Sequence, residues 1–320
     1  MKVLITGSRG FVGAALMRRL VDSGHHVSGF SRQGGDDTLR GDLLDPTSIR
    51  EALITFQPDV IYNLAAETDL KGPPKNGYAA NTAGVGHLLE AVANAPSVQR
   101  VIWMSSQLVN RPGRPPSSDT HFDPDGGYGA SKAEGERRVR AANGGGKTWV
   151  IARSTTIWGP GMSEHYLGIL RLIRRGLYFH VGRTPRLKSY SYIDTLTAQL
   201  EALGTVAEAE IAGRVMYLAD SPPVDLRAWS DAFAAQFGRR LYTLPEPLAR
   251  LLGVMGDLAA ATGLKTPLTS RRLDNMMTDY VYDTTPIDTI AGPPTISMAE
   301  GVRRTADWLI AQDRTTGETR

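Results

Sequence analysis

The sequence contains no cysteine and no long apolar run. The lack of cysteine excludes disulfides, thiolate metal sites and a cysteine nucleophile, and we predict no metal site. No apolar stretch approaches the length that crosses a bilayer. The first residues already read as a core strand, so no targeting peptide is expected. These absences favour a soluble, cytoplasmic protein without a membrane partner.

The chain also lacks a large charge excess of either sign. Its 36 Lys and Arg residues against 33 Asp and Glu leave a formal net charge of +3 over 320 residues. Such a balance provides no electrostatic reason to expect a nucleic acid as partner. With 41% hydrophobic residues, the chain is long enough for one large domain or two unequal ones.

The stretch from Lys2 to Leu20 has the pattern of a strand, a glycine turn and a helix. Val3–Ile5 is an apolar run typical of a strand buried on both faces of a parallel sheet. Apolar residues at helical spacing follow the turn, so free backbone N–H groups and a positive helix end face an anion. A helix that merely begins with glycines is the alternative. The GxxGxxG spacing predicts a dinucleotide site formed by Gly7, Ser8, Arg9, Gly10, Phe11, Val12 and Gly13.

The end of the second predicted strand bears on the choice between NADP and NAD. An NAD-preferring site places Asp or Glu there, but this chain has Ser31 and Arg32. Together with Arg9 from the glycine turn, Arg32 suits a 2′-phosphate, which needs charge-assisted donors. We therefore predict NADP(H) as the preferred cofactor. NAD(H) stays possible if both arginines are solvated and Asp36 or Asp37 binds the ribose.

Strands and helices alternate at the spacing of βαβ units through the first half of the chain. The sequence therefore predicts an α/β fold: a Rossmann-type doubly wound parallel sheet with a smaller C-terminal α+β substrate-binding portion. We expect an NAD(P)-binding domain over residues 1–160, with returns to the sheet at about 187–220, and an interleaved substrate portion over 161–320. In this second part, helices are predicted near 166–175, 196–203, 226–237, 248–262 and 298–311.

Other residues at strand ends are predicted to contact the cofactor. Asp42 and Leu43 precede a helix start and are expected over the adenine edge. Small side chains after the third long strand let backbone lie close to a ligand. The remaining predicted cofactor residues are Leu64, Ala65, Ala66, Ser105 and Ser154.

Tyr128 and Lys132 carry the predicted chemistry. They are four residues apart on one predicted helix and so project from the same face. An ammonium near a phenol favours the phenolate, which makes Tyr128 a general acid or base for interconverting a carbonyl and an alcohol. Ser106, at the end of a strand, can hydrogen-bond the same carbonyl oxygen. Lys132 can also hold the nicotinamide ribose.

Several motifs together resemble the short-chain dehydrogenase/reductase superfamily, and more narrowly its extended branch, the NAD(P)-dependent epimerase/dehydratase family of nucleotide-sugar enzymes. They are TGSRGFVG (6–13), GDLLDP (41–46), NLAAET (63–68), ANTAG (80–84), SSQ (105–107), YGASK (128–132), ARSTTIWGPG (152–161) and YSYID (190–194). The resemblance implies that Ser106, Tyr128 and Lys132 form a catalytic triad and that Asn81 steadies the active-site helix. It also implies a homodimer through helices 81–95 and 128–142.

The resemblance implies a substrate site that departs from the family pattern, also where Val109-Asn110-Arg111 replace the family's tyrosine-rich continuation after the serine. Its residues would be Thr68, Ser106, Gln107, Thr156, Lys188 and Arg272. The family usually has Asn at the position of Thr156 and Arg at that of Lys188, and Arg272 lies in a segment resembling one that grips the diphosphate of a sugar nucleotide.

The leading hypothesis for the reaction is NADPH-dependent reduction of a 4-keto nucleotide sugar. A nucleotide-sugar 4-epimerase is one alternative, although the arginines at the adenosine end disfavour it. Reduction of a hydrophobic steroid- or flavonoid-type ketone is another, motivated by Thr156 and Lys188. A dehydratase is disfavoured because Gln107 is neutral, and a catalytically inactive cofactor-binding protein is disfavoured by the intact Ser–Tyr–Lys set.

Overall fold

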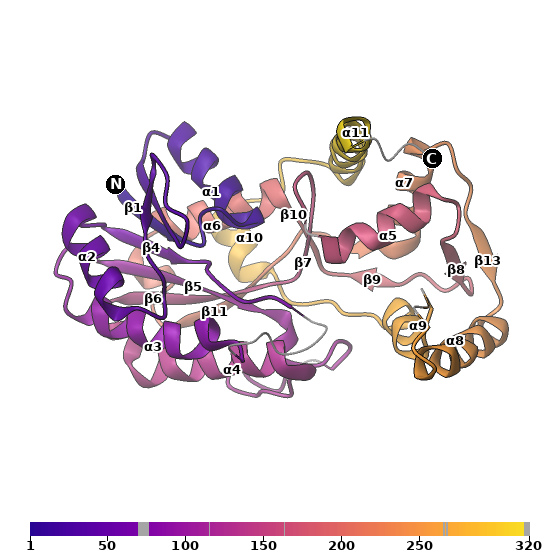
Figure 1. Ribbon diagram of the computed structural model, residues 1–320, viewed down its shortest axis with the longest axis horizontal. Helices are drawn as coiled ribbons and strands as arrows, with labels where there is room; N and C mark the ends of the chain where they lie inside the picture. Colours follow the sequence, from indigo (N-terminus) through magenta and orange to yellow (C-terminus); the bar gives the residue numbers. More distant parts are fainter. Residues whose placement is uncertain (70–76, 115, 163, 265, 267, 317–320) are drawn as a thin grey trace. The chain divides into compact units, whose positions relative to one another are not determined.

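The computed structural model describes residues 1–69, 77–114, 116–162, 164–264, 266 and 268–316 (Figure 1). The chain forms two compact units. The first, which we call the sheet unit, comprises Met1–Ile157, Ser191–Ala219 and Tyr282–Pro294. The second unit comprises Trp158–Tyr190, Asp220–Val281 and Thr295–Arg320. The sequence predicted that residues 1–160 and 187–220 form the sheet unit. It did not predict that Tyr282–Pro294 also belong to this unit.

A seven-stranded sheet forms the centre of the sheet unit. Its strands lie in the order β11-β6-β5-β4-β1-β2-β3, and each pairs with its neighbours in parallel. This order confirms the predicted Rossmann-type doubly wound sheet. The strands are β1 (Lys2–Thr6), β2 (His26–Ser31), β3 (Thr38–Arg40), β4 (Val60–Asn63), β5 (Arg100–Ser106), β6 (Thr148–Ser154) and β11 (Arg214–Leu218).

Helices bury both faces of this sheet, which explains the continuous apolar runs in its strands. Alternate residues of β1 point to opposite faces: Leu4 joins one core cluster, whereas Val3 and Ile5 join the other. The first face is covered by α2 (Pro46–Phe56), α3 (Ala79–Ala93) and α4 (Gly126–Ala141), and the second by α1 (Phe11–Asp22), α6 (Ile193–Thr205) and α10 (Thr285–Ala291) (Figure 1).

The turn between β1 and α1 requires its glycines. Gly7 has a φ of +69°, and a Cβ added there would lie 2.8 Å from the Cα of Ala65. A Cβ on Gly13 would lie 2.3 Å from the carbonyl oxygen of Gly7. Gly10 is the N-cap residue of α1. It has no side chain that could hydrogen-bond the first backbone N–H groups of the helix. The turn therefore leaves room for a ligand at the start of α1.

The second unit contains short strands and five helices among its described residues. Its strands β9 (Leu187–Lys188) and β12 (Val224–Asp225) pair antiparallel, and β8 (Phe179–Val181) pairs in parallel with β13 (Tyr242–Leu244). Its helices are α5 (Glu164–Arg174), α7 (Leu226–Gln236), α8 (Glu246–Ala261), α9 (Ser270–Met277) and α11 (Met298–Thr316). Trp229 packs edge-on against Trp158, Tyr190 and Phe233, with ring centroids 4.7–5.8 Å apart.

The remaining elements are short. They are β7 (Thr156–Trp158), β10 (Tyr190–Tyr192) and the 3₁₀ turns η1 (Gln107–Val109), η2 (Asn143–Gly145) and η3 (Glu208–Glu210). Each of the five helices predicted after residue 160 has a counterpart, whereas α9, α10 and β3 were not predicted. None of the helices in the described ranges combines the length and the apolar character needed to span a membrane.

Candidate active site

The start of α4 brings the predicted catalytic residues together. The helix begins at Gly126, two residues before the predicted start at Tyr128, and packs against η1, which directly follows Ser106. The approach is close, because a Cβ on Gly129 would lie 2.1 Å from the carbonyl oxygen of Leu108. Tyr128 and Lys132 are therefore one turn apart on a helix that touches the segment carrying Ser106.

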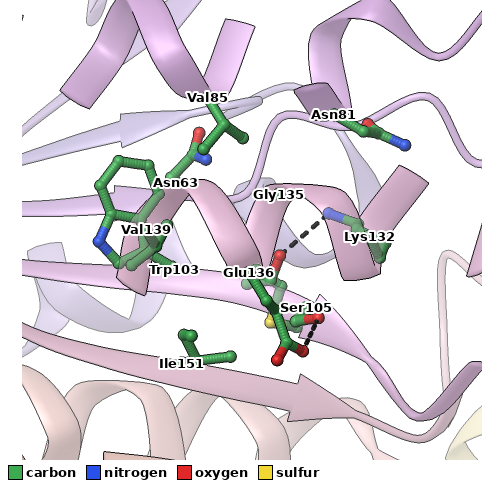
Figure 2. Close-up of a pocket in the computed structure, with 11 residues that line it drawn as sticks. Asn63, Asn81, Val85, Trp103, Ser105, Lys132, Gly135, Glu136, Val139 and Ile151 are labelled. Atoms are coloured by element: carbon green, nitrogen blue, oxygen red, sulfur yellow. Dashed lines mark hydrogen bonds between the residues drawn. The ribbon is translucent and has the colours of Figure 1, made fainter. Parts of the chain in front are cut away.

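Lys132 is buried, with its ammonium bound to the sheet. Its Nζ donates a hydrogen bond of 2.9 Å to the carbonyl oxygen of Met104 in β5 (Figure 2), and the residue is 8% exposed. Burial lowers the pKa of Lys132 to about 8, while the charge of Glu136 opposes the shift. Lys132 therefore exchanges its proton closer to neutral pH than an exposed lysine does.

Tyr128 is partly buried at the first turn of the same helix. Its ring lies beside that of Tyr78, with centroids 6.3 Å apart. The hydroxyl of Tyr78 donates to the carbonyl oxygen of Asp69 at 2.5 Å. Two tyrosines thus lie close together, and the one on α4 shares its helix face with Lys132.

Asn81 connects α4 to the segment that follows β4. Its Nδ2 donates to the carbonyl oxygen of Glu67 and to the Oγ of Ser131, both at 2.9 Å, and its Oδ1 accepts from the Glu67 N–H at 2.9 Å. Ser131 lies between Tyr128 and Lys132 on α4. The amide of Asn81 therefore positions the turn of α4 that bears both residues.

The two serines at the end of β5 have different partners. Ser105 donates a buried hydrogen bond of 2.6 Å to Oε1 of Glu136, and its carbonyl oxygen accepts from the hydroxyl of Ser154 at 3.1 Å. The hydroxyl of Ser106 accepts from the Leu108 N–H at 3.1 Å, so its proton can be donated elsewhere. The two serines predicted as cofactor contacts, Ser105 and Ser154, have their hydroxyls engaged within the protein. Ser106 keeps the donor that a catalytic serine needs.

A buried ion pair beneath α4 was missed in the sequence. Arg153 donates from Nε to Oε1 of Glu136 at 2.9 Å and from Nη2 to Oε2 at 2.8 Å. The side chains are 0% and 2% exposed. Burial acts to lower the pKa of Arg153, but hydrogen bonds and charge from Glu136 raise it overall. A glutamate four residues after Lys132, on the same helix face, was the available signal.

A small cavity of about 20 Å³ lies beside this pair (Figure 2). Its polar walls include Asn63, Asn81, Ser105, Lys132 and Glu136. Trp103 also lines it, and the indole N–H of this residue is buried without a partner among the described residues. A cavity of this size and polarity has room for one water molecule.

The adenosine end of the predicted cofactor site has arginine and orphaned hydroxyls. Arg9 donates from Nη1 to the carbonyl oxygen of Gly34 at 3.1 Å, so the glycine turn and the segment after β2 are in contact as expected. Arg32 is exposed. The hydroxyls of Ser8 and Ser31 are buried without a partner in the described part of the chain. Such donors are typical of a site built for a polar ligand.

The other predicted cofactor residues have mostly structural contacts. Asp42 accepts from the Leu44 N–H at 3.0 Å, and Leu43 is buried in the core. The Ala65 N–H donates to Thr6 Oγ1 at 3.1 Å. Leu64, Ala65 and Ala66 are partly buried, and Ala65 lies against the turn at Gly7.

The predicted substrate residues are divided between the two units. Thr68 is exposed in the sheet unit, where Gln107 donates from Nε2 to Thr156 Oγ1 at 3.5 Å. In the second unit, Arg272 is exposed on α9 and donates to the carbonyl oxygen of Thr266 at 3.3 Å.

Lys188 is 1% exposed in the second unit. Its ammonium donates to the carbonyl oxygens of Asn275, at 2.7 Å, and Thr278, and lies 4.0 Å from the ring centroid of Tyr280. Burial lowers the pKa of Lys188 to about 7, opposed by Asp279 and assisted by Arg186.

Comparison with known proteins identifies the family. Residues 3–186 match the NAD dependent epimerase/dehydratase family. The chain belongs to this family, whose members are enzymes that use nicotinamide cofactors. This confirms the resemblance inferred from the motifs.

Individual relatives differ in what they act on. The chain is 28% identical to 2-alkyl-3-oxoalkanoate reductase of Stenotrophomonas maltophilia, covering 95% of this chain and 98% of the relative. It is 25% identical to UDP-glucose 4-epimerase of Vibrio cholerae, covering 98% and 97%. The structure of UDP-glucuronic acid 4-epimerase from Bacillus cereus, in complex with UDP-glucuronic acid and NAD, matches with a TM-score of 0.74, 21% identity and coverage of 98% and 100%.

The lowered pKa of Lys132 predicts a pH dependence of stability. In the folded protein this pKa is about 8, against 10.5 for an ordinary lysine, so between these values the unfolded chain binds more protons. The free energy of unfolding of the wild type should therefore rise with pH relative to Lys132→Met, by about 3 kcal/mol between pH 8 and 10.5. Urea unfolding of both proteins across this range measures the difference, and parallel curves would contradict the assignment.

Proposed function

We propose that the protein is an NADP(H)-dependent reductase that converts a ketone with apolar substituents into a secondary alcohol. The observation that carries the reaction type is the placement of Tyr128 one turn before the buried Lys132, on a helix that touches η1 beside Ser106. This arrangement supplies a proton donor, a cation that stabilises its conjugate base, and a second hydrogen-bond donor.

Each residue has one task in this reaction. When bound, the nicotinamide would supply the hydride that the carbonyl carbon accepts. The phenol of Tyr128 delivers a proton to the carbonyl oxygen, and the hydroxyl of Ser106 donates a hydrogen bond to the same oxygen as charge develops on it. Lys132 donates one hydrogen bond to Met104 and keeps two N–H donors for the phenolate and the cofactor ribose. Its positive charge favours the phenolate that remains.

The glycine turn supports binding of the cofactor diphosphate. Side chains at Gly7 or Gly13 would collide with backbone, and the N-cap residue of α1 provides no side-chain cap to its first N–H groups. The hydroxyls of Ser8 and Ser31 are buried at this end of the sheet and have no partner among the described residues. Arg9 and Arg32 support NADP(H) over NAD(H), because a 2′-phosphate pairs well with guanidinium groups.

The surroundings of Lys188 favour an apolar substrate over a sugar nucleotide. At this position the family usually has an arginine, whose planar guanidinium suits a phosphate better than an ammonium does. In this chain, two carbonyl oxygens and the Tyr280 ring enclose the Lys188 ammonium. A cation satisfied in this way gains little by turning to a phosphate. The similarity to 2-alkyl-3-oxoalkanoate reductase over nearly the whole chain supports the same substrate class.

Reduction of a 4-keto nucleotide sugar, the leading hypothesis from the sequence, is the second candidate. The exposed Arg272 on α9 favours it, since its guanidinium can accept a diphosphate partner. The similarity to the Vibrio cholerae epimerase also points to this substrate class. For either substrate we retain the expected homodimer through α3 and α4 as part of the proposal.

Tyr128→Phe should abolish turnover while leaving cofactor binding intact. The variant loses only the hydroxyl that delivers the proton, so we expect kcat to fall by about a thousandfold. Tyr78→Phe is the matched control. The neighbouring hydroxyl of Tyr78 is bonded to Asp69, and its loss should change kcat by less than about threefold. NADPH oxidation assays, with Kd from fluorescence titration, give both quantities. Unchanged turnover in Tyr128→Phe would eliminate the proposed proton donor.

Arg9→Ala and Arg32→Ala should weaken NADPH binding without weakening NADH binding. Loss of one charge-assisted contact to the 2′-phosphate predicts an increase in Kd of about tenfold to a hundredfold. Arg50→Ala, an exposed arginine on α2, serves as control and should leave both affinities unchanged. Equal affinity of the wild type for NADH and NADPH would refute the proposed cofactor preference.

A substrate panel separates the two candidate functions. We expect NADPH-dependent reduction of 2-alkyl-3-oxoalkanoates, with kcat/KM rising about threefold to fourfold for each added CH₂ group until the pocket is filled. UDP-, GDP-, CDP- and dTDP-sugars should give neither turnover nor thermal stabilisation. Stabilisation by one nucleotide class alone, lost in Arg272→Ala, would establish the second candidate instead.

A further inference from the structure

The buried carboxylate of Glu136 contacts more than one segment of the candidate active site. It lies one turn after Lys132 on α4, and Oε1 accepts from Ser105, whose chain neighbours are Met104 and Ser106. Met104 in turn provides the carbonyl oxygen that holds the Lys132 ammonium. Glu136 thus joins the helix that bears Tyr128 and Lys132 to the strand end that bears Ser106.

Arg153 extends this connection to the segment that leads into α4. From Nη2 it donates to the carbonyl oxygen of Asp119 at 2.7 Å, and its guanidinium lies 5.7 Å from the ring centroid of Phe122. Arg140 and Arg137, both on α4, contact the same two residues. The segment entering α4 just before Tyr128 is therefore held by arginines from β6 and from the helix itself.

On its other side, Arg153 is fixed to the edge of the sheet. Its Nη1 donates to the hydroxyl of Tyr217 in β11 at 3.1 Å. The ring of Tyr217 stacks on that of Tyr282, with centroids 4.3 Å apart and an interplanar angle of 11°. Every face of the guanidinium is thus engaged, and the Glu136–Arg153 pair has little freedom to move.

We propose that the Glu136–Arg153 pair positions the catalytic residues. By fixing α4 to the end of β5, it keeps Tyr128 and Lys132 at the correct distance from Ser106. Stability alone is a weak reason for such a pair, because apolar side chains of similar volume are often as stabilising as a buried ion pair. The pair instead joins the helix that carries Tyr128 and Lys132 to the strand end that carries Ser106, and it also holds the segment that leads into this helix. The inference rests on the proposed reductase function.

The pair also acts on Lys132 through charge. Glu136 is the acidic group that raises the pKa of Lys132 against the effect of burial. The elements around Lys132 carry further titratable or charged groups, among them Tyr128 on α4, Arg153 on β6, Tyr78 beside α3 and Glu67 after β4. Loss of the Glu136 charge leaves Arg153 as a buried cation nearby and should lower the pKa of Lys132 further.

Three variants test the proposal. Glu136→Gln removes the negative charge but keeps an acceptor for Ser105. Glu136→Leu with Arg153→Met removes both charges and every hydrogen bond of the pair, and it avoids the unpaired buried arginine that the single change Glu136→Leu would leave. Glu134→Gln is the control, because Glu134 lies on the same helix and pairs with Arg138, but in an exposed position.

The variants distinguish the effect of the pair on the geometry of the site from the effect of its charge on Lys132. In the double variant, NADPH affinity should stay within about threefold of wild type, while kcat falls by at least about tenfold with little change in KM, because the reacting groups lose their register. In Glu136→Gln, the pKa of Lys132 should fall below that of the wild type, measured by NMR of ¹⁵N-labelled lysine with Lys132→Arg for assignment. The control should match the wild type in both measurements.

A folded double variant with wild-type kcat, or an unchanged Lys132 pKa in Glu136→Gln, would overturn the positioning role. Failure of the proposed reductase function has a different signature. The wild type would then reduce no ketone and Tyr128→Phe would have no effect, whereas the NMR titration would still report whether Glu136 controls the charge of Lys132.

Discussion

The candidate active site depends on how α4 is held against the sheet. Val139 is the one large apolar side chain that this helix buries; its other buried residues are Gly129, Ser131, Lys132, Ala133, Gly135 and Glu136. A helix with so small an apolar face gains little from the hydrophobic effect. Close backbone packing at its glycines and hydrogen bonds from its polar residues must fix it instead. The same contacts that hold the helix therefore place its reactive side chains.

The sheet supplies the second constraint. Parallel strands end at one edge, so Thr6, Asn63 and Ser106 lie at the carboxyl ends of adjoining strands. Between β1 and β4 the chain order reverses, which opens the crevice where α/β sheets bind nucleotides. The hydroxyl of Thr6 connects these strand ends, since it donates to Asn63 and accepts from the N–H of Ala65. The glycine turn and the strand ends beside α4 are thus connected at one edge of the sheet.

Local patterns in the sequence were enough to predict most of the sheet unit. The glycine spacing, the apolar strand runs and the i, i+4 relation of Tyr128 and Lys132 are all read within a few residues. The sequence predicts the start of α4 two residues late because the helix begins with Gly126 and Gly127, which are poor helix formers. The three-residue strand β3 has too few residues to show a period.

Contacts between elements that are distant in the sequence could not be predicted from such local patterns. Glu136 and Arg153 are 17 residues apart, on a helix and on a strand, and each is a charged residue of the kind usually solvated. Ser105 and Ser106 are adjacent and chemically identical in sequence. The family pattern favoured Ser106 as the catalytic serine, but only the structure shows that Ser105 donates to Glu136 whereas the hydroxyl of Ser106 can still donate.

Lys188 shows how one residue can change the character of a site. An arginine presents a planar fork of donors that matches a phosphate, whereas a lysine ends in a compact ammonium that a few carbonyl oxygens can satisfy. In this chain those oxygens come from Asn275 and Thr278, and the ring of Tyr280 completes the enclosure. Through these hydrogen bonds the ammonium connects β9 to the C-terminal end of α9 and the residue after it. A position at which the family usually has an arginine is thereby part of the interior of the second unit, and its cation is satisfied by the protein itself.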